Sequence, residues 1–149
     1  MRSIETRASV LEDAKVPVKL KLSALWAALM FLYAYGDIFA FFRPSFIEEV
    51  MAGEVFAFEI NQVFLLTISI YVAIPAVMVF LALMLNPGIS RWVNIVLGLV
   101  YAVTILLSTI GEDYVYYFFL SFLEGAIALL IVWSAWKWPE QGIGGRAAR

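Results

Sequence analysis

The sequence predicts an all-α protein that crosses a membrane four times as a helix bundle, and two observations lead to this prediction. Hydrophobic residues make up 64% of the 149 residues and charged residues only 15%, whereas soluble domains are about 45–50% apolar and about 25% charged. The charged residues also fall mainly between four apolar stretches, each close to the roughly 20 residues that a helix needs to span about 30 Å of hydrocarbon. We therefore expect one polytopic membrane domain over residues 1–149.

The predicted spans follow one another with short breaks in the second half of the chain. Asn86-Pro87-Gly88 and Gly111-Glu112-Asp113 are turn sequences that interrupt a helix. Because such short connections join antiparallel neighbours, the last three spans should pack side by side. A signal peptide is the alternative interpretation of the first stretch, but that stretch is too long and lacks a small-residue cleavage site. The four predicted spans are residues 22–42, 63–85, 92–110 and 114–136.

The one long connection, residues 43–62, predicts a short amphipathic helix on the outer surface of the membrane. Ser45-Phe46-Ile47-Glu48 has the pattern of a capping box, and Gly53 suits a helix C-terminus. We favour a helix that lies on the membrane surface, with a lid over the bundle as the alternative. The chain ends, about 1–17 and 139–149, are polar or glycine-rich and are expected to be loose.

Basic residues set the predicted orientation. Of the ten lysines and arginines, only Arg43 falls on the outer side of this topology. The positive-inside rule therefore predicts that both termini lie in the cytoplasm, N-in/C-in, and the five tryptophans lie toward the same ends, as an interfacial aromatic belt should. The basic residues on the cytoplasmic side are Arg2, Arg7, Lys15, Lys19, Lys21, Arg91, Lys137, Arg146 and Arg149.

The composition excludes several classes of function. The chain has no cysteine and no histidine, so disulfides, thiolate nucleophiles, histidine-ligated haem and histidine–zinc sites are excluded. A net charge of −2 offers no basic surface for nucleic acid, and no phosphate-binding loop is present. The carboxylates are too scattered for a di-metal bundle. We expect no enzymatic activity, no catalytic residue, no metal and no cofactor.

Two carboxyls inside the predicted spans are the strongest indication of function. A charged side chain near the bilayer centre costs about 2.5–3.5 kcal/mol on insertion scales, so such residues are usually functional or paired. Asp37 lies about 7–8 Å and Glu124 about 15 Å below the outer ends of their spans, at 1.5 Å per residue. No lysine or arginine falls at that depth. An unpaired carboxyl there favours its neutral form, which can both donate and accept hydrogen bonds.

These carboxyls define a candidate site for a ligand or a proton. Tyr33 lies one helical turn before Asp37, and Tyr117 shares a face with Glu124. Asn94, on the third span, lies beside a stripe of small residues and could join them. The alternative is that all five groups only hydrogen-bond between helices and fix the register of the bundle.

Three further residues concern packing. Pro75, near the middle of the second span, removes one backbone hydrogen bond and frees the carbonyl of Tyr71. It could act as a hinge, although a simple packing kink is the more ordinary interpretation. Gly98 and Gly125 have small-residue spacings, including Ser121-x-x-x-Gly125, that permit close helix approach or formation of a homo-oligomer.

Several motifs together carry a resemblance to a known family. They are VKLKLSALW (18–26), MFLYAYGD (30–37), AIPAVMVF (73–80), NP (86–87), RWVNI (91–95) with Gly98, YFFL (117–120) with Glu124, and LIVWSAWKWP (130–139). On these motifs the chain resembles, over about residues 18–139, a bacterial family of short four-helix membrane proteins of unknown function. The resemblance implies a bacterial inner-membrane location and a recurring pattern, but no established activity. The recurring residues are Tyr33, Asp37, Pro75, Arg91, Asn94 and Glu124.

Two kinds of function follow from these observations. The first is a small membrane protein that binds or moves a small ligand, a cation or a proton through a polar pocket built on the two carboxyls. The second is an accessory or assembly subunit of a larger membrane complex. The architecture is also similar to that of DoxX-like four-helix proteins, which implies a third possibility, the handling of quinone or lipid.

Overall fold

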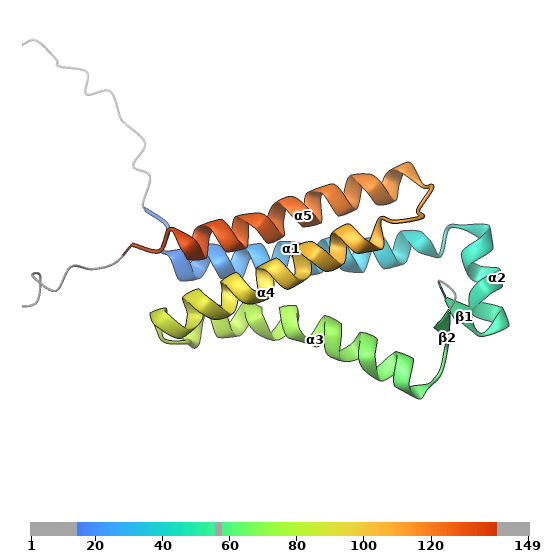
Figure 1. The fold of residues 1–149 in the computed structure, drawn as a ribbon, viewed down its shortest axis with the longest axis horizontal. Coiled ribbons are helices and arrows are strands. Elements are labelled where there is room, and N and C mark those ends of the chain that lie inside the picture. The colour runs from blue at the N-terminus through green and yellow to red at the C-terminus, as the bar shows by residue number, and fades with distance from the viewer. Residues whose placement is uncertain (1–14, 56–57, 140–149) are drawn as a thin grey trace, which may run out of the picture.

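The protein is described by a computed structural model that covers residues 15–55 and 58–139 (Figure 1). These described residues contain four helices that are long and apolar enough to cross a membrane, so the predicted all-α, four-helix membrane fold is confirmed. They are α1 (Val18–Ala40), α3 (Gln62–Met84), α4 (Pro87–Ser108) and α5 (Val115–Trp136). The predicted loose ends and the four terminal arginines fall mostly or wholly outside the described residues.

Prolines explain where two of the long helices begin. α4 begins at Pro87, five residues before the predicted Trp92. A proline suits the first position of a helix, because the N–H that it lacks would have no partner there and its fixed φ is already helical. α1 likewise begins directly after Pro17, at Val18 rather than at Leu22. Each long helix has 22 or 23 residues and is therefore about 33–35 Å long, which matches the hydrocarbon core.

The helices pack in a different order from their order along the chain. α1 packs against both α3 and α5, and α5 packs against α4. α3 and α4 have far fewer close backbone contacts, although a short turn joins them, and Figure 1 shows α3 diverging from the other helices toward its N-terminus. The expectation that the last three spans pack side by side therefore holds for α4 and α5 and is wrong for most of α3.

The two ends of the bundle differ. Residues 15–17 and 137–139, together with the turn between α3 and α4, lie at one end, which we call the terminal end (Figure 1). The opposite end, which we call the loop end, carries α2 and the turn between α4 and α5. The loop end is the side that the sequence predicts to be outside the cell.

The predicted short helix is present as α2 (Pro44–Ala52), but its predicted capping box is wrong. The N-cap residue is Arg43, and in the described residues its side chain makes no capping hydrogen bond. Pro44 fixes the first helical position, so Ser45 already lies inside the helix and cannot cap it. Gly53 ends the helix as predicted, with a φ of +86° that favours glycine over other residues.

A small β-hairpin follows α2. β1 (Glu54–Val55) pairs antiparallel with β2 (Phe58–Glu59). The Ile60 N–H donates to the Gly53 carbonyl at 2.8 Å and closes the base of the hairpin. The hairpin was not predicted, because strands of two residues are too short to show the alternation of apolar and polar residues that marks a strand.

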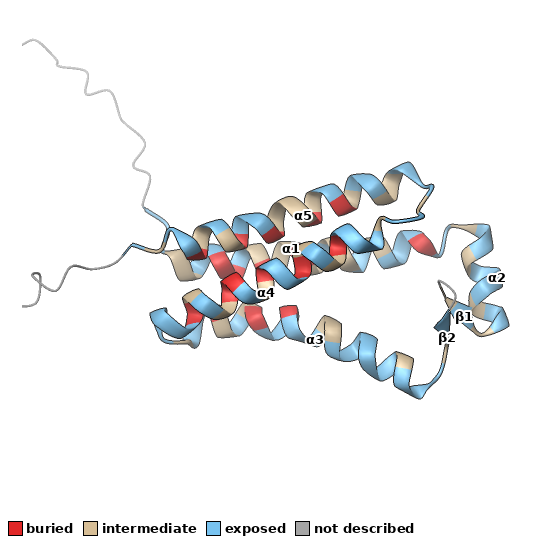
Figure 2. Ribbon diagram, viewed as in Figure 1, coloured by how far each residue is buried: buried red, intermediate tan, exposed pale blue. Residues whose placement is uncertain are grey.

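The core lies along the inward faces of the four long helices (Figure 2). Trp26 of α1 and Tyr101 of α4 are its largest fully buried side chains, and their rings meet edge to face at 5.7 Å. Many large apolar side chains on the outward faces are exposed, as expected where lipid covers them. The other buried apolar residues are Leu22, Leu29, Ala40, Met78, Ala82, Ile95, Ile105, Ala128, Ile131 and Ala135.

α4 and α5 approach each other closely at Gly98. A Cβ atom on Gly98 would stand 2.8 Å from Val132 Cγ2 and 3.3 Å from the Ala128 carbonyl oxygen, so only glycine fits without a shift. Gly125 differs, because in the described chain no heavy atom of a neighbouring helix lies within 4 Å of the place where its Cβ would stand. The predicted close approach through small residues is therefore found at Gly98 and is absent at Gly125.

Pro75 leaves a gap in the hydrogen bonding of α3, and α4 fills it. Without an N–H on Pro75, the Tyr71 carbonyl has no partner one turn further along its own helix. The Tyr101 hydroxyl of α4 donates a hydrogen bond to this carbonyl. The Tyr71 hydroxyl lies 2.7 Å from Thr104 Oγ1, also of α4. Side chains thus join α3 and α4 where their backbones are too far apart to pack closely.

The Tyr101 hydrogen bond can be tested by a double-mutant cycle. Tyr101→Phe should lower the free energy of unfolding by about 1–2 kcal/mol, because it leaves the Tyr71 carbonyl unpaired in an apolar environment. Pro75→Ala restores an N–H to α3, so Tyr101→Phe in that background should cost about 0.5 kcal/mol or less. Unfolding in mixed detergent micelles measures both values, with the exposed Tyr35→Phe as the matched control. An equal cost in both backgrounds would contradict this account.

The two glycines form a second matched pair. Gly98→Ala should destabilise the protein by about 1–3 kcal/mol, because the added methyl group forces α4 and α5 apart. Gly125→Ala should leave stability unchanged or raise it by up to about 1 kcal/mol, because alanine is the better helix former. Both substitutions change helix propensity equally, so the difference between the Tm values of the two variants measures the effect of the close contact between α4 and α5 at Gly98. Equal Tm values for the two variants would rule out the close approach.

Candidate functional site

The two predicted carboxyls come together because α1 and α5 run in opposite directions (Figure 1). Asp37 lies about 4.5 Å from the end of α1, and Glu124 about 13.5 Å from the start of α5. Helical side chains tilt toward the N-terminus of their own helix, so the two carboxyls lean toward each other. Glu124 Oε1 stands 3.9 Å from where a Cβ on Gly36, next to Asp37, would lie.

The two carboxyls differ in exposure. Glu124 is only 8% exposed, whereas Asp37 is exposed. The prediction of two buried carboxyls is therefore wrong for Asp37, because α1 ends at Ala40 and places this residue in its last turn at the loop end. Within residues 15–55 and 58–139, neither carboxyl has a hydrogen bond or a salt bridge.

Tyr33 of α1 contacts tyrosines from two other helices. The Tyr33 hydroxyl of α1 is 3.3 Å from that of Tyr71 of α3, and the ring of Tyr71 lies 4.8 Å from that of Tyr101 of α4. Tyr33 lies three residues before Gly36, the residue that Glu124 Oε1 approaches, so this predicted residue lies within about one helical turn of the carboxyl. We call Tyr33, Tyr71 and Tyr101 the tyrosine cluster.

Tyr117 approaches the carboxyls from the loop end. It lies two helical turns before Glu124 on α5 and is partly buried. Tyr117 therefore lies on the same face of α5 as Glu124, between that carboxyl and the loop end. The structure therefore brings together four of the five predicted site residues: Tyr33, Asp37, Tyr117 and Glu124.

Asn94 does not join this group. Its Oδ1 accepts a hydrogen bond of 2.7 Å from Trp26 Nε1, and its Nδ2 donates to the carbonyl and the hydroxyl of Ser90 at 2.7 and 3.2 Å. It lies about 10 Å from the start of α4, whereas Tyr101 lies about 21 Å from it. Asn94 thus ties α1 to α4 near the terminal end, which is the packing role that the sequence left as the alternative.

The sequence prediction omitted Tyr71, Tyr101 and Thr104. A tyrosine in a membrane span is usually assigned to the interface, so none of the three was singled out as part of the site. The sequence does contain an indication for Tyr71 and Tyr101. Pro75 frees the Tyr71 carbonyl, which then needs a donor at its own depth, and Tyr101 lies about as far from the turn between α3 and α4 as Tyr71 does, about 20 Å.

At the loop end, Arg43 is held by Glu112. Its Nη1 lies 3.0 Å from Glu112 Oε2, and its Cζ lies 3.8 Å from the centre of the Tyr114 ring. Burial lowers the pKa of Arg43, but its interactions with Glu112, Tyr114 and Tyr116 raise that pKa by more, so the guanidinium stays charged. The positive charge of Arg43 at the loop end is therefore neutralised by the Glu112 carboxylate.

The fold and this site define a multi-pass membrane protein with four spanning helices and a carboxyl held between them. The chain belongs to the family of unknown function DUF6326, whose sequence pattern matches residues 12–144. The predicted membership of a family of unknown function is thereby confirmed over nearly the whole chain. Comparison with curated proteins and with solved structures finds no match.

Proposed function

We propose that this protein binds a proton or a small cation at Glu124 and moves it between the two sides of the membrane. One observation carries the proposal: the Glu124 carboxyl lies about 18 Å from the terminal end of α5, between helices, and no donor or cation of the described chain pairs with it. Such a group costs free energy in a membrane and is usually retained for function. The proposal includes no catalytic residue, metal or organic cofactor.

The neighbours of Glu124 suit a proton or a cation. A carboxyl in an apolar environment favours either protonation or a bound cation, and a second carboxyl close by strengthens that preference. Asp37 supplies the second carboxyl, and Tyr33 and Tyr117 supply hydroxyl oxygens that can accept from or donate to the bound species. A small organic amine has the same chemistry and would use the same groups.

Access to the site is proposed from the loop end. Asp37 lies in the last turn of α1, near that end, whereas Trp26 and Asn94 fill the centre of the bundle on the other side of the tyrosine cluster. Acidic side chains at the loop end attract cations toward this entrance. They are Glu48, Glu49, Glu54, Glu59, Glu112 and Asp113.

Transport requires that the site open to the other side as well. Pro75 is the proposed hinge, because only a side-chain hydrogen bond from Tyr101 replaces the missing backbone bond there. Breaking that bond would let α3 swing about Pro75 relative to α4. The close seam at Gly98 keeps α4 and α5 together as one body in this movement.

We propose that both termini face the cytoplasm of a bacterial cell and that the protein lies in the inner membrane. Lys19 and Arg91 support this orientation, because both lie at the terminal end, whereas Arg43 at the loop end is paired with Glu112. The Lys19 ammonium donates to the Leu83 and Leu85 carbonyls at the end of α3, so it also stabilises that helix end.

Flux through vesicles tests the proposal. The full chain is reconstituted into liposomes that contain a pH-sensitive dye, and a potassium diffusion potential drives protons inward; a parallel assay measures uptake of sodium. Glu124→Gln should abolish flux, and Asp37→Asn should reduce it about tenfold or more, because each removes a carboxyl from the route. The control, Tyr35→Phe, changes an exposed side chain of α1 outside the route and should behave as the wild type. Full activity of a folded Glu124→Gln protein would overturn the proposal.

A second function is favoured by the position of Asp37. A carboxyl exposed on the side of a spanning helix is better tolerated when a neighbouring protein covers it. An accessory or assembly subunit of a larger membrane complex, or a homo-oligomer, would provide that cover. A DoxX-like role in quinone or lipid handling remains a prediction that rests on architecture alone.

Native mass spectrometry of the protein extracted gently from its own membrane separates these functions. If the protein is an independent carrier, the spectrum should contain one copy or a small homo-oligomer, and Asp37→Leu should leave this mass unchanged. If it is a subunit, a second membrane protein should be present in fixed stoichiometry. In that case Asp37→Leu should release the partner, whereas Glu48→Gln should not.

A further inference from the structure

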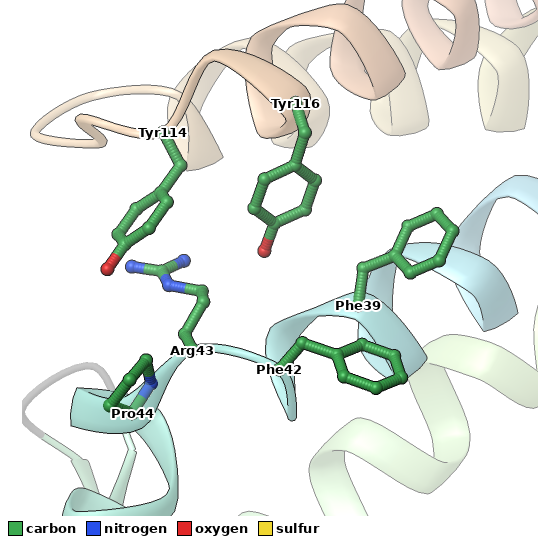
Figure 3. A pocket seen from close by; sticks show the side chains of 6 residues that line it. All are labelled: Phe39, Phe42, Arg43, Pro44, Tyr114 and Tyr116. Atoms are coloured by element: carbon green, nitrogen blue, oxygen red, sulfur yellow. The ribbon is translucent and has the colours of Figure 1, made fainter.

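The loop end contains a hollow that the proposed transport site does not use. It has a volume of about 320 Å³ and lies where α1 ends, the chain turns into α2, and α5 begins (Figure 3). Aromatic rings form most of its wall, and one arginine enters it. The lining residues are Phe39, Phe42, Arg43, Pro44, Tyr114 and Tyr116.

Two donors in this hollow have no partner in the described chain. Arg43 Nε and the Tyr116 hydroxyl are both buried, and although Tyr116 lies close enough to the guanidinium to raise its pKa, neither atom has a hydrogen bond of normal length and angle. In Figure 3 the Tyr116 hydroxyl points from α5 toward the side on which Arg43 and Phe42 lie. Buried polar groups are nearly always hydrogen-bonded, so two such donors beside one hollow indicate that a bound molecule supplies an acceptor.

Charge balance indicates that this acceptor is neutral. Arg43 already forms a salt bridge of 3.0 Å with Glu112, and its guanidinium lies over the Tyr114 ring. An anion in the hollow would have to compete with the Glu112 carboxylate for the same cation. A carbonyl oxygen can instead accept from Nε and from the Tyr116 hydroxyl without disturbing that pair.

The place of the hollow in the membrane indicates what carries such a carbonyl. α1 and α5 are each about 33–35 Å long, so their ends at the loop end reach the boundary between hydrocarbon and head groups. The ester carbonyls of membrane lipids lie at that boundary. Phe39 and Phe42 offer apolar rings on the side of the hollow next to the hydrocarbon.

We propose that this hollow is a binding site for a membrane glycerolipid. The lipid's ester carbonyl accepts hydrogen bonds from Arg43 Nε and the Tyr116 hydroxyl, and the adjoining acyl chain lies along Phe39 and Phe42. The site does not depend on the proposed transport function, because it shares no residue with the route through Glu124.

Matched lipids test this proposal on the full purified chain. Dioctanoyl phosphatidylcholine has two ester carbonyls, and its dialkyl ether analogue has the same head group without them. Native mass spectrometry during titration should show that the wild type binds the ester lipid about fivefold more tightly than the ether lipid. Tyr116→Phe should reduce ester binding about fivefold and leave ether binding unchanged, so that the two become equal. Tyr35→Phe, an exposed tyrosine on α1 that does not line the hollow, should keep the wild-type preference.

Three results would overturn the proposal. Equal binding of ester and ether lipids by the wild type would mean that the site does not recognise the ester carbonyl. Full ester preference in Tyr116→Phe would mean that this hydroxyl makes no hydrogen bond to the lipid. Selective binding of anionic phosphatidylglycerol that is lost in Arg43→Lys would identify a head-group site instead.

Discussion

A membrane offers no water to backbone groups, and the arrangement of this bundle depends on how one such group is satisfied. Pro75 removes the N–H that would pair with the Tyr71 carbonyl, and an unpaired carbonyl in hydrocarbon costs several kcal/mol. The Tyr101 hydroxyl supplies the donor from the neighbouring helix. Because a phenol reaches much further than a backbone, α3 can be satisfied while it diverges from α4. The hydrogen bonds of the tyrosine cluster thus keep α3 joined to α4 where their backbones diverge.

The buried polar groups toward the terminal end are hydrogen-bonded, whereas Glu124 and Ser121, one turn apart on α5, have no hydrogen bond within the described residues. Ser23 donates to the Val79 carbonyl at 2.8 Å and Trp26 donates to Asn94, so both tie α1 to another helix. Asn94 in turn donates to the Ser90 carbonyl within α4. Glu124 makes no such bond, although it is as buried as Ser23. A purely structural carboxyl would be expected to have acquired a partner by the same means, and this contrast is the reason to assign it a function.

The sequence predicted those features that follow from composition and local geometry. Four apolar stretches gave four helices, Gly53 ended α2, and the residue spacing placed Tyr33 and Tyr117 with their carboxyls. The errors arise where a feature depends on which helix lies opposite. Asn94 and Gly125 share residue types and spacings with true site or seam residues, and hydropathy does not distinguish one lipid-facing side of a spanning helix from another. The capping box failed for a local reason, because Pro44 fixes a helix start more firmly than the hydroxyl of Ser45 can.

Buried side chains are distributed unevenly along the bundle, so its two halves should differ in local stability. Most buried side chains, among them Leu22, Trp26 and Ile131, lie in the half toward the terminal end, and Gly98 closes a tight seam there (Figure 2). The half toward the loop end has few buried apolar residues and holds instead an unpaired carboxyl and two unpaired donors. Stability in proteins is local, and regions with few buried apolar contacts open at a lower cost in free energy. The terminal half is therefore the more rigid part, and the proposed movement of α3 about Pro75 would change the loop half, where the proposed binding groups lie.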